Sequence, residues 1–175
     1  HMITSLVPGV SSIHSVDLDG DGDKDVLSAS YVGDKIAWYE NLGDGIFDDQ
    51  VLISTQQDFP YSVYSTDLDN DGDMDVLAAS QSDDIVAWYE NLGGGLFSSM
   101  QVISTLARIP TCVYADDLDG DSDMDVLSSS LFDLLIACYS NSGDGSFGPQ
   151  QTITTEANGS FAVYAADLDN DGDQD

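Results

Sequence analysis

The chain has 175 residues and a formal net charge of −30, from 33 acidic residues against three basic ones. A surface of this charge repels phosphate backbones and anionic lipid headgroups, so we expect no nucleic-acid partner and no binding to membrane surfaces. No apolar run approaches the length of a transmembrane segment, so we expect no membrane insertion. The length fits one domain or a piece of a larger protein.

The first repeat is predicted to form four short strands. A strand over 12–16 leads into an Asp-rich loop over 17–25, and further strands are expected over 26–31, 35–41 and 47–53. Alternating apolar and polar residues, β-prone residue types and a glycine-rich turn support these assignments. Helical periodicity is missing between the strands, and the sequence therefore predicts an all-β chain.

The same elements return along the chain. The stretch DLDGDGDKD begins at Asp17, and related stretches begin at Asp67, Asp117 and Asp167, which is a constant period of 50 residues. A fixed period of this length indicates a solenoid, propeller or array, and four antiparallel strands per repeat favour β-propeller blades. We therefore expect three complete blades and the first strand of a fourth, over 161–166.

The period also sets the expected domain boundaries. His1 and Met2 are interpreted as the remnant of an expression tag, and residues 3–5 align with 53–55, at the end of a predicted outer strand. The expected units are the tag with the end of a preceding blade (1–11), blade 1 (12–61), blade 2 (62–111), blade 3 (112–160) and the start of blade 4 (161–175).

The Asp-rich loop has the composition of a calcium site. Carboxylates stand at loop positions 1, 3, 5 and 9, and position 7 is expected to offer its backbone carbonyl. Calcium takes about six to eight oxygen ligands in a flexible shell, whereas magnesium demands near-octahedral geometry and zinc and copper prefer nitrogen or sulfur. Without a cation, these like charges would repel one another. We predict one Ca²⁺ per loop, up to four per chain.

The predicted metal ligands are the five aspartates of each loop. They are Asp17, Asp19, Asp21, Asp23, Asp25, Asp67, Asp69, Asp71, Asp73, Asp75, Asp117, Asp119, Asp121, Asp123, Asp125, Asp167, Asp169, Asp171, Asp173 and Asp175.

The loop differs from an EF-hand in its second half. An EF-hand has a bidentate glutamate at position 12, where this chain has Ser28, Ala78 or Ser128, and a predicted strand follows in place of a helix. Position 6 is glycine in three copies and Ser122 in the third. If position 6 needs a positive φ, the serine strains that turn and weakens its site.

The two cysteines, Cys112 and Cys138, occur only in the third repeat. We expect them on strands that are separated by another strand, which disfavours a disulfide, and interpret them as two small buried thiols. They do not indicate a compartment. The calcium loops favour an extracellular location, either secreted or at the cell surface, because extracellular calcium modules work at millimolar calcium.

The DxDxDG-type loop, followed by WYENLGDGIF and its copies, resembles the FG-GAP repeats of integrin alpha-chain propellers. It is more similar still to bacterial VCBS-type repeats. The resemblance covers the whole chain apart from the tag residues. It implies that the loop joins the first two strands of a blade, and that calcium bound by the aspartates of Asp17–Asp25 and their equivalents rigidifies one face of a usually seven-bladed ring. It also implies extracellular adhesion or ligand recognition, and its relatives include sugar-binding lectins and polysaccharide-cleaving enzymes.

Three functions of different class follow from these observations. The favoured one is a calcium-binding structural or recognition module with a protein or glycan ligand. The alternative is a carbohydrate-binding lectin, in which aromatic residues such as Trp38 and Trp88 stack on sugar rings, although packing between blades is favoured for them. The propeller domain of a polysaccharide-active enzyme is the weakest of the three hypotheses. The carboxylates are committed to the loops and no Ser/His/Asp or Cys/His set appears, so we expect no enzyme activity and assign no catalytic residues.

A closed propeller needs more blades than the sequence contains. Rings close with about four to eight blades, and this chain supplies three with the start of a fourth. Open sheet faces and unpaired strands invite association. We therefore expect either a homo-oligomer that completes a ring or a piece of a longer protein.

Overall fold

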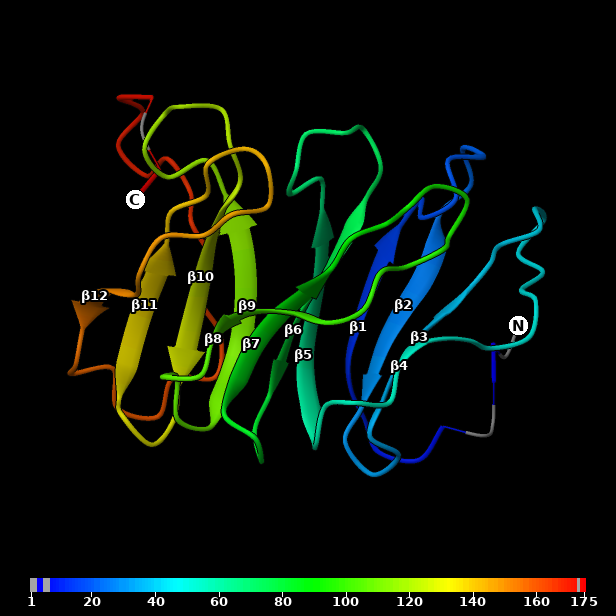
Figure 1. Cartoon of the computed structure of the whole chain (residues 1–175), viewed down its shortest axis with the longest axis horizontal. Coiled ribbons are helices and arrows are strands. Elements are labelled where there is room, and N and C mark those ends of the chain that lie inside the picture. The colour runs from blue at the N-terminus through cyan, green and yellow to red at the C-terminus, as the bar shows by residue number, and fades with distance from the viewer. Residues whose placement is uncertain (1–2, 5–6, 173) are drawn as a thin grey trace.

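The protein folds into three β-sheets that lie side by side (Figure 1). The computed structural model describes residues 3–4, 7–172 and 174–175. Each sheet contains four antiparallel strands in chain order, which confirms the predicted all-β class and the three four-stranded blades. Within the described residues, no helix is long and apolar enough to cross a membrane.

Each sheet corresponds to one repeat. The first sheet consists of β1 (Val10–Val16), β2 (Asp25–Ser30), β3 (Lys35–Tyr39) and β4 (Val51–Ser54). The second consists of β5 (Pro60–Thr66), β6 (Asp75–Ser80), β7 (Ile85–Tyr89) and β8 (Gln101–Ser104). The third consists of β9 (Pro110–Asp116), β10 (Asp125–Ser130), β11 (Leu135–Tyr139) and β12 (Gln151–Thr154).

The fourth strand of each repeat is shorter than predicted. In the first sheet, the expected strand over 47–53 is reduced to an isolated bridge between Asn41 and Phe47, followed by β4 from residue 51. The two residues before Gln50 and its equivalents are Asp-Asp, Ser-Ser and Gly-Pro in the three repeats. Aspartate, glycine and proline are poor strand formers, which explains the interrupted ladder in the first and third repeats.

The predicted strand over 161–166 is not formed as a strand. Among the described residues, the only backbone pairing of this segment is between Ala166 and Asp175, at the mouth of the fourth loop. The segment nevertheless lies beside β9 as β5 lies beside β1. The Thr111 hydroxyl donates to the Ser160 carbonyl (2.9 Å), just as the Ser11 hydroxyl donates to the Pro60 carbonyl (3.1 Å). A segment in this position needs a full hydrogen-bonded neighbour to become a strand.

Neighbouring sheets are joined by apolar contacts that use the repeated aromatic residues. Trp38 of the first sheet is buried against the second sheet, and a Cβ on Gly95 would collide with its ring. Trp88 stands in the same relation to Gly145 and also packs edge-on against Phe147. The tryptophans are therefore core residues between blades, and they are not available as platforms for sugar rings.

Candidate metal centre

The four Asp-rich loops lie at the same end of the molecule, at the top of the view in Figure 1. The first loop (17–25) joins β1 to β2, the second (67–75) joins β5 to β6, and the third (117–125) joins β9 to β10. The fourth loop (167–175) follows the segment beside β9. One candidate centre per repeat is thus placed on one face.

Each loop is shaped by hydrogen bonds from its own backbone to its carboxylates. In the first loop, Asp17 accepts bonds from the N–H groups of Gly20 (2.8 Å) and Gly22 (3.0 Å). Asp19 accepts from Asp21 N–H (3.1 Å), and Asp21 accepts from Asp23 N–H (2.8 Å). These short-range bonds curl the backbone, and the sequence spacing therefore specifies the loop locally.

The curl brings carboxylate oxygens together in every loop. Within each group the ligand atoms lie within 4.8 Å of one another. Positions 1 and 3 take part in all four groups, and position 5 or position 9 supplies the third member. The groups are Asp17 with Asp19 and Asp25, Asp67 with Asp69 and Asp71, Asp117 with Asp119 and Asp121, and Asp167 with Asp169 and Asp175.

The aspartate at position 9 also anchors the loop to its sheet. Asp75 is fully buried, and its two carboxylate oxygens accept bonds from the N–H groups of Leu68 (2.8 Å) and Asn91 (2.8 Å). Burial raises the pKa of Asp75 to about 7, against the lowering effect of these two bonds, and the nearby charges of Asp69 and Asp71 raise it further. Burial also raises the pKa of Asp25 and of Asp125.

The side chains at position 7 lie outside the carboxylate groups. The Asp23 and Asp73 carboxylates lie beside Gly43 and Gly93 in the turn that follows the third strand, and Asp123 lies beside Gly143. Asp173, the fourth predicted ligand at this position, falls outside the described residues. The role of position 7 through its backbone carbonyl stays a prediction.

A glutamate that was not among the predicted ligands reaches the first loop. Glu40 forms a second group with Asp19 and Asp21, with ligand atoms again within 4.8 Å. In the second repeat, the charge of Glu90 contributes to the raised pKa of Asp69, after burial and the charge of Asp71. The third repeat has Ser140 at this position. The shared glutamate of the two WYEN segments was the available signal.

Ser122 adopts a positive φ, the backbone conformation that the glycines of the other repeats suggested for position 6. Its φ is +78°, compared with +96° at Gly22, +97° at Gly72 and +100° at Gly172. Side chains with a Cβ rarely adopt this conformation, so the third loop carries strain that the other loops avoid.

The residues present fit a hard divalent cation. All the grouped side-chain donors are carboxylate oxygens, the ligand type that calcium prefers. In the second loop, Asp67 Oδ1 is buried and has no hydrogen-bond partner. A buried, unpartnered carboxylate oxygen is costly unless a positive charge lies next to it. A cation held among Asp67, Asp69 and Asp71 would supply that charge.

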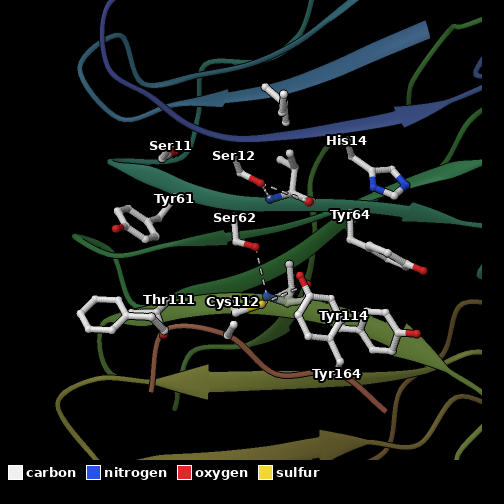
Figure 2. A pocket seen from close by; sticks show the side chains of 15 residues that line it. Ser11, Ser12, His14, Tyr61, Ser62, Tyr64, Thr111, Cys112, Tyr114 and Tyr164 are labelled. Carbon is white, nitrogen blue, oxygen red and sulfur yellow. Dashed lines mark hydrogen bonds between the residues drawn. The ribbon is translucent and has the colours of Figure 1, made fainter. Parts of the chain in front are cut away.

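A groove of about 450 Å³ runs along β1, β5 and β9, the first strands of the three sheets (Figure 2). Four of the rings that line it stand 50 residues apart and form a ladder, His14–Tyr64–Tyr114–Tyr164, with ring centroids 4.8, 5.0 and 5.3 Å apart. Burial raises the pKa of Tyr114 to about 12, and the hydroxyl donates to Asp116 (3.0 Å). The Tyr164 side chain is 73% exposed.

Comparison with known proteins gives a family and a fold. The model of the FG-GAP-like repeat matches residues 17–78, 67–128 and 133–175. None of the curated proteins compared with this chain matches it. One similar solved structure is a lectin of Agrocybe aegerita, described as recognising non-reducing terminal N-acetylglucosamine, with a TM-score of 0.61 and 22% identity. The match covers 85% of this chain and 39% of the lectin.

A second similar structure is BBS1N, solved in complex with ARL6DN. Its TM-score is 0.53 and its identity 16%, over 85% of this chain and 44% of that one. The chain thus spans less than half the length of both structural relatives. At these identities, the two structures support the fold and nothing finer.

Proposed function

The chain belongs to the family of FG-GAP-like repeat proteins, and from this premise we propose that it is a calcium-binding β-propeller module. In this proposal it serves as an extracellular scaffold for adhesion or ligand recognition. The ions would be held by the carboxylates at loop positions 1, 3, 5 and 9, with Glu40 as a further candidate in the first repeat.

The observation that carries the proposal is the unpartnered carboxylate oxygen inside a repeated all-oxygen group. Asp67 Oδ1 is buried without a hydrogen bond, and it belongs to the group with Asp69 and Asp71. Lys24 is the only basic residue within any of the four loops. The chain itself therefore supplies little positive charge at these positions, and a divalent ion would supply it.

Calcium would act on the fold through the position 9 aspartates. Asp75 is the last residue of the second loop and the first of β6. Its carboxylate accepts bonds from Leu68 N–H in the loop and from Asn91 N–H just after β7, so an ordered loop is tied to both β6 and the end of β7. A ligand that binds only the folded state stabilises it, by about 4 kcal/mol per site at about 1,000 times its dissociation constant. The chemistry that the ion supplies is charge neutralisation and cross-linking.

The proposed location is extracellular, because exposed calcium loops of adhesion modules are filled at millimolar calcium. We also propose that copies of the chain associate to complete a propeller ring, with the terminal sheet of one copy packed against that of the next. Between the first two sheets, Asn91 Nδ2 donates to the Leu18 carbonyl (2.7 Å). Among the described residues, the side-chain amide of Asn41, the counterpart of Asn91 in the first sheet, donates only to the Lys24 carbonyl of its own sheet (3.0 Å). An equivalent bond could therefore be made to another sheet. Light scattering in calcium tests this association, and a monomer mass at all concentrations would contradict it.

A glycan is the second candidate ligand, and the groove in Figure 2 favours it. The exposed Tyr164 ring offers a stacking surface, and Ser12 and Tyr61 carry hydroxyl groups along the same groove. A glycan array in calcium tests this candidate, with the Tyr164→Ala variant as the matched control. Retained binding in that variant would place any glycan elsewhere.

Calorimetric titration of calcium into the chelator-treated protein tests the main proposal. We expect heat of binding with up to four ions per chain and a melting temperature that falls in EGTA. Magnesium at the same concentration is the control and should bind more weakly, because it keeps its waters and demands octahedral geometry. No heat of binding together with melting unchanged by EGTA would refute the proposal.

A further inference from the structure

Asn70 connects the second Asp-rich loop to the third. Its side-chain amide donates to Asp123 Oδ1 (2.8 Å) and to the Gly143 carbonyl (3.2 Å). Asn70 stands at loop position 4 with a φ of +61°, a left-handed conformation that asparagine tolerates better than most residues. The bond spans 53 residues of sequence and joins two neighbouring sheets at their loop face.

No such bond joins the first loop to the second. Position 4 of the first loop is Gly20, which has no side chain to reach Asp73, the counterpart of Asp123. Position 4 of the third loop is also glycine, Gly120. Of the three described sheets, only the second and third are therefore connected at position 4 of a loop.

The bond joins residues that neighbouring ions would immobilise. Asn70 lies between Asp69 and Asp71, two members of the carboxylate group of the second loop, and Asp123 follows two residues after Asp121 of the third. An ion in either loop would reduce the conformational freedom of one bonding partner. The loss of entropy on forming the bond is then smaller, and the second ion would bind to a loop that is already partly ordered.

We propose that Asn70 couples calcium binding at the second loop to calcium binding at the third, so that each ion raises the affinity for the other. The inference rests on the proposed calcium function. Coupling of this kind is reciprocal. Because the bond is solvent-exposed, its effect is modest, and we expect about a two- to fivefold change in affinity.

The test is a double-mutant cycle in the full chain, read by calcium calorimetry. Asn70→Gly keeps the left-handed backbone and removes the amide, and Asp117→Asn disables the third loop. Asn70→Gly should weaken the second and third sites about two- to fivefold, and it should have no effect when Asp117→Asn is already present. An equal loss in both backgrounds would show that Asn70 acts only on its own loop, and would overturn the inference.

A matched control and a gain-of-function variant complete the test. Asn170→Gly makes the same change at the same loop position and the same φ of +61°, and it should leave the coupling of the second and third loops unchanged. Gly20→Asn should create coupling between the first and second loops, because Gly20 has a φ of +79° and nothing lies within 4 Å of an added Cβ. Failure of Gly20→Asn to add coupling would also count against the inference.

These outcomes separate the inference from the function on which it rests. If the wild-type chain binds no calcium, both are wrong. If it binds calcium and Asn70→Gly leaves the affinities unchanged, the calcium function stands and only the coupling is overturned.

Discussion

Replacing Gln57 with alanine should stabilise the protein. Gln57 lies between β4 and β5, is 2% exposed, and has no hydrogen-bond partner for either its side-chain oxygen or its nitrogen. Burying an unpartnered amide costs about 1–3 kcal/mol. Fixing a glutamine side chain costs up to about 2 kcal/mol of rotamer entropy. Against these gains, truncation removes one buried methylene group, worth about 0.8 kcal/mol, because the Cβ of glutamine is kept in alanine.

The expected net gain in the free energy of unfolding is about 1–2 kcal/mol. For a chain of this size, each kcal/mol raises the melting temperature by about 2–4 °C. The equivalent position in the second sheet supports this sign, because Ala107 is fully buried there and packs in the core. Urea unfolding at saturating calcium measures the change. It should be fitted with a common slope, so that a shift in midpoint reports stability.

Gln56→Ala is the matched control, since it makes the same chemical change at the neighbouring exposed position. It should alter the free energy of unfolding by less than about 0.5 kcal/mol. A destabilisation of more than about 1 kcal/mol by Gln57→Ala would refute the reasoning. It would mean that the amide is satisfied, for example by a buried water, and that its removal leaves a cavity.

Three further predictions concern the loops and the contacts between sheets. In EGTA, the free energy of unfolding should fall as pH rises from about 4 to about 7. The pKa of Asp75 is raised to about 7 in the folded state, so the folded protein holds this proton more tightly than the unfolded chain. A free energy of unfolding that rises with pH across this window would contradict the raised pKa of Asp75. Ser140→Glu should raise the calcium affinity of the third loop severalfold, by supplying the carboxylate present in the first two repeats, and calorimetry showing unchanged affinity would argue against a ligand role for Glu40. Asn91→Ala should cost about 1–2 kcal/mol more than Asn41→Ala in urea unfolding. Of these two side chains, only that of Asn91 donates a buried bond to a neighbouring described sheet, at the Leu18 carbonyl. Equal losses would show that this bond contributes little.

Much of the candidate site was predictable because its geometry is local. Asp17 reaches Gly20 and Gly22 through bonds that span three and five residues, so the spacing of the aspartates is enough to specify the curl of the loop. The positive φ at position 6 was also visible in advance as a glycine that one repeat replaces with Ser122. Local bonds leave a pattern that a single repeat can show.

The contribution of Glu40 was not predictable in this way. It stands 15 residues after Asp25, at the end of another strand, and it reaches Asp19 and Asp21 only because β2 and β3 pair in a particular register. The segment over 161–166 shows the opposite case. Its strand-like pattern was recognised, but a pattern cannot supply the hydrogen-bonded neighbour that makes a strand.

The repeat, the all-β class, the four strands per sheet and the position of the Asp-rich loops could therefore be predicted from the amino-acid sequence, because each depends on residues close together in a repeat. Which loops are in contact, which side-chain amide is buried without a hydrogen-bond partner and which sheet accepts a hydrogen bond from its neighbour became visible in the folded chain. The Asn70–Asp123 and Asn91–Leu18 contacts span 53 and 73 residues. Such contacts depend on how one sheet packs on the next, and that packing is decided by the side chains of both sheets together.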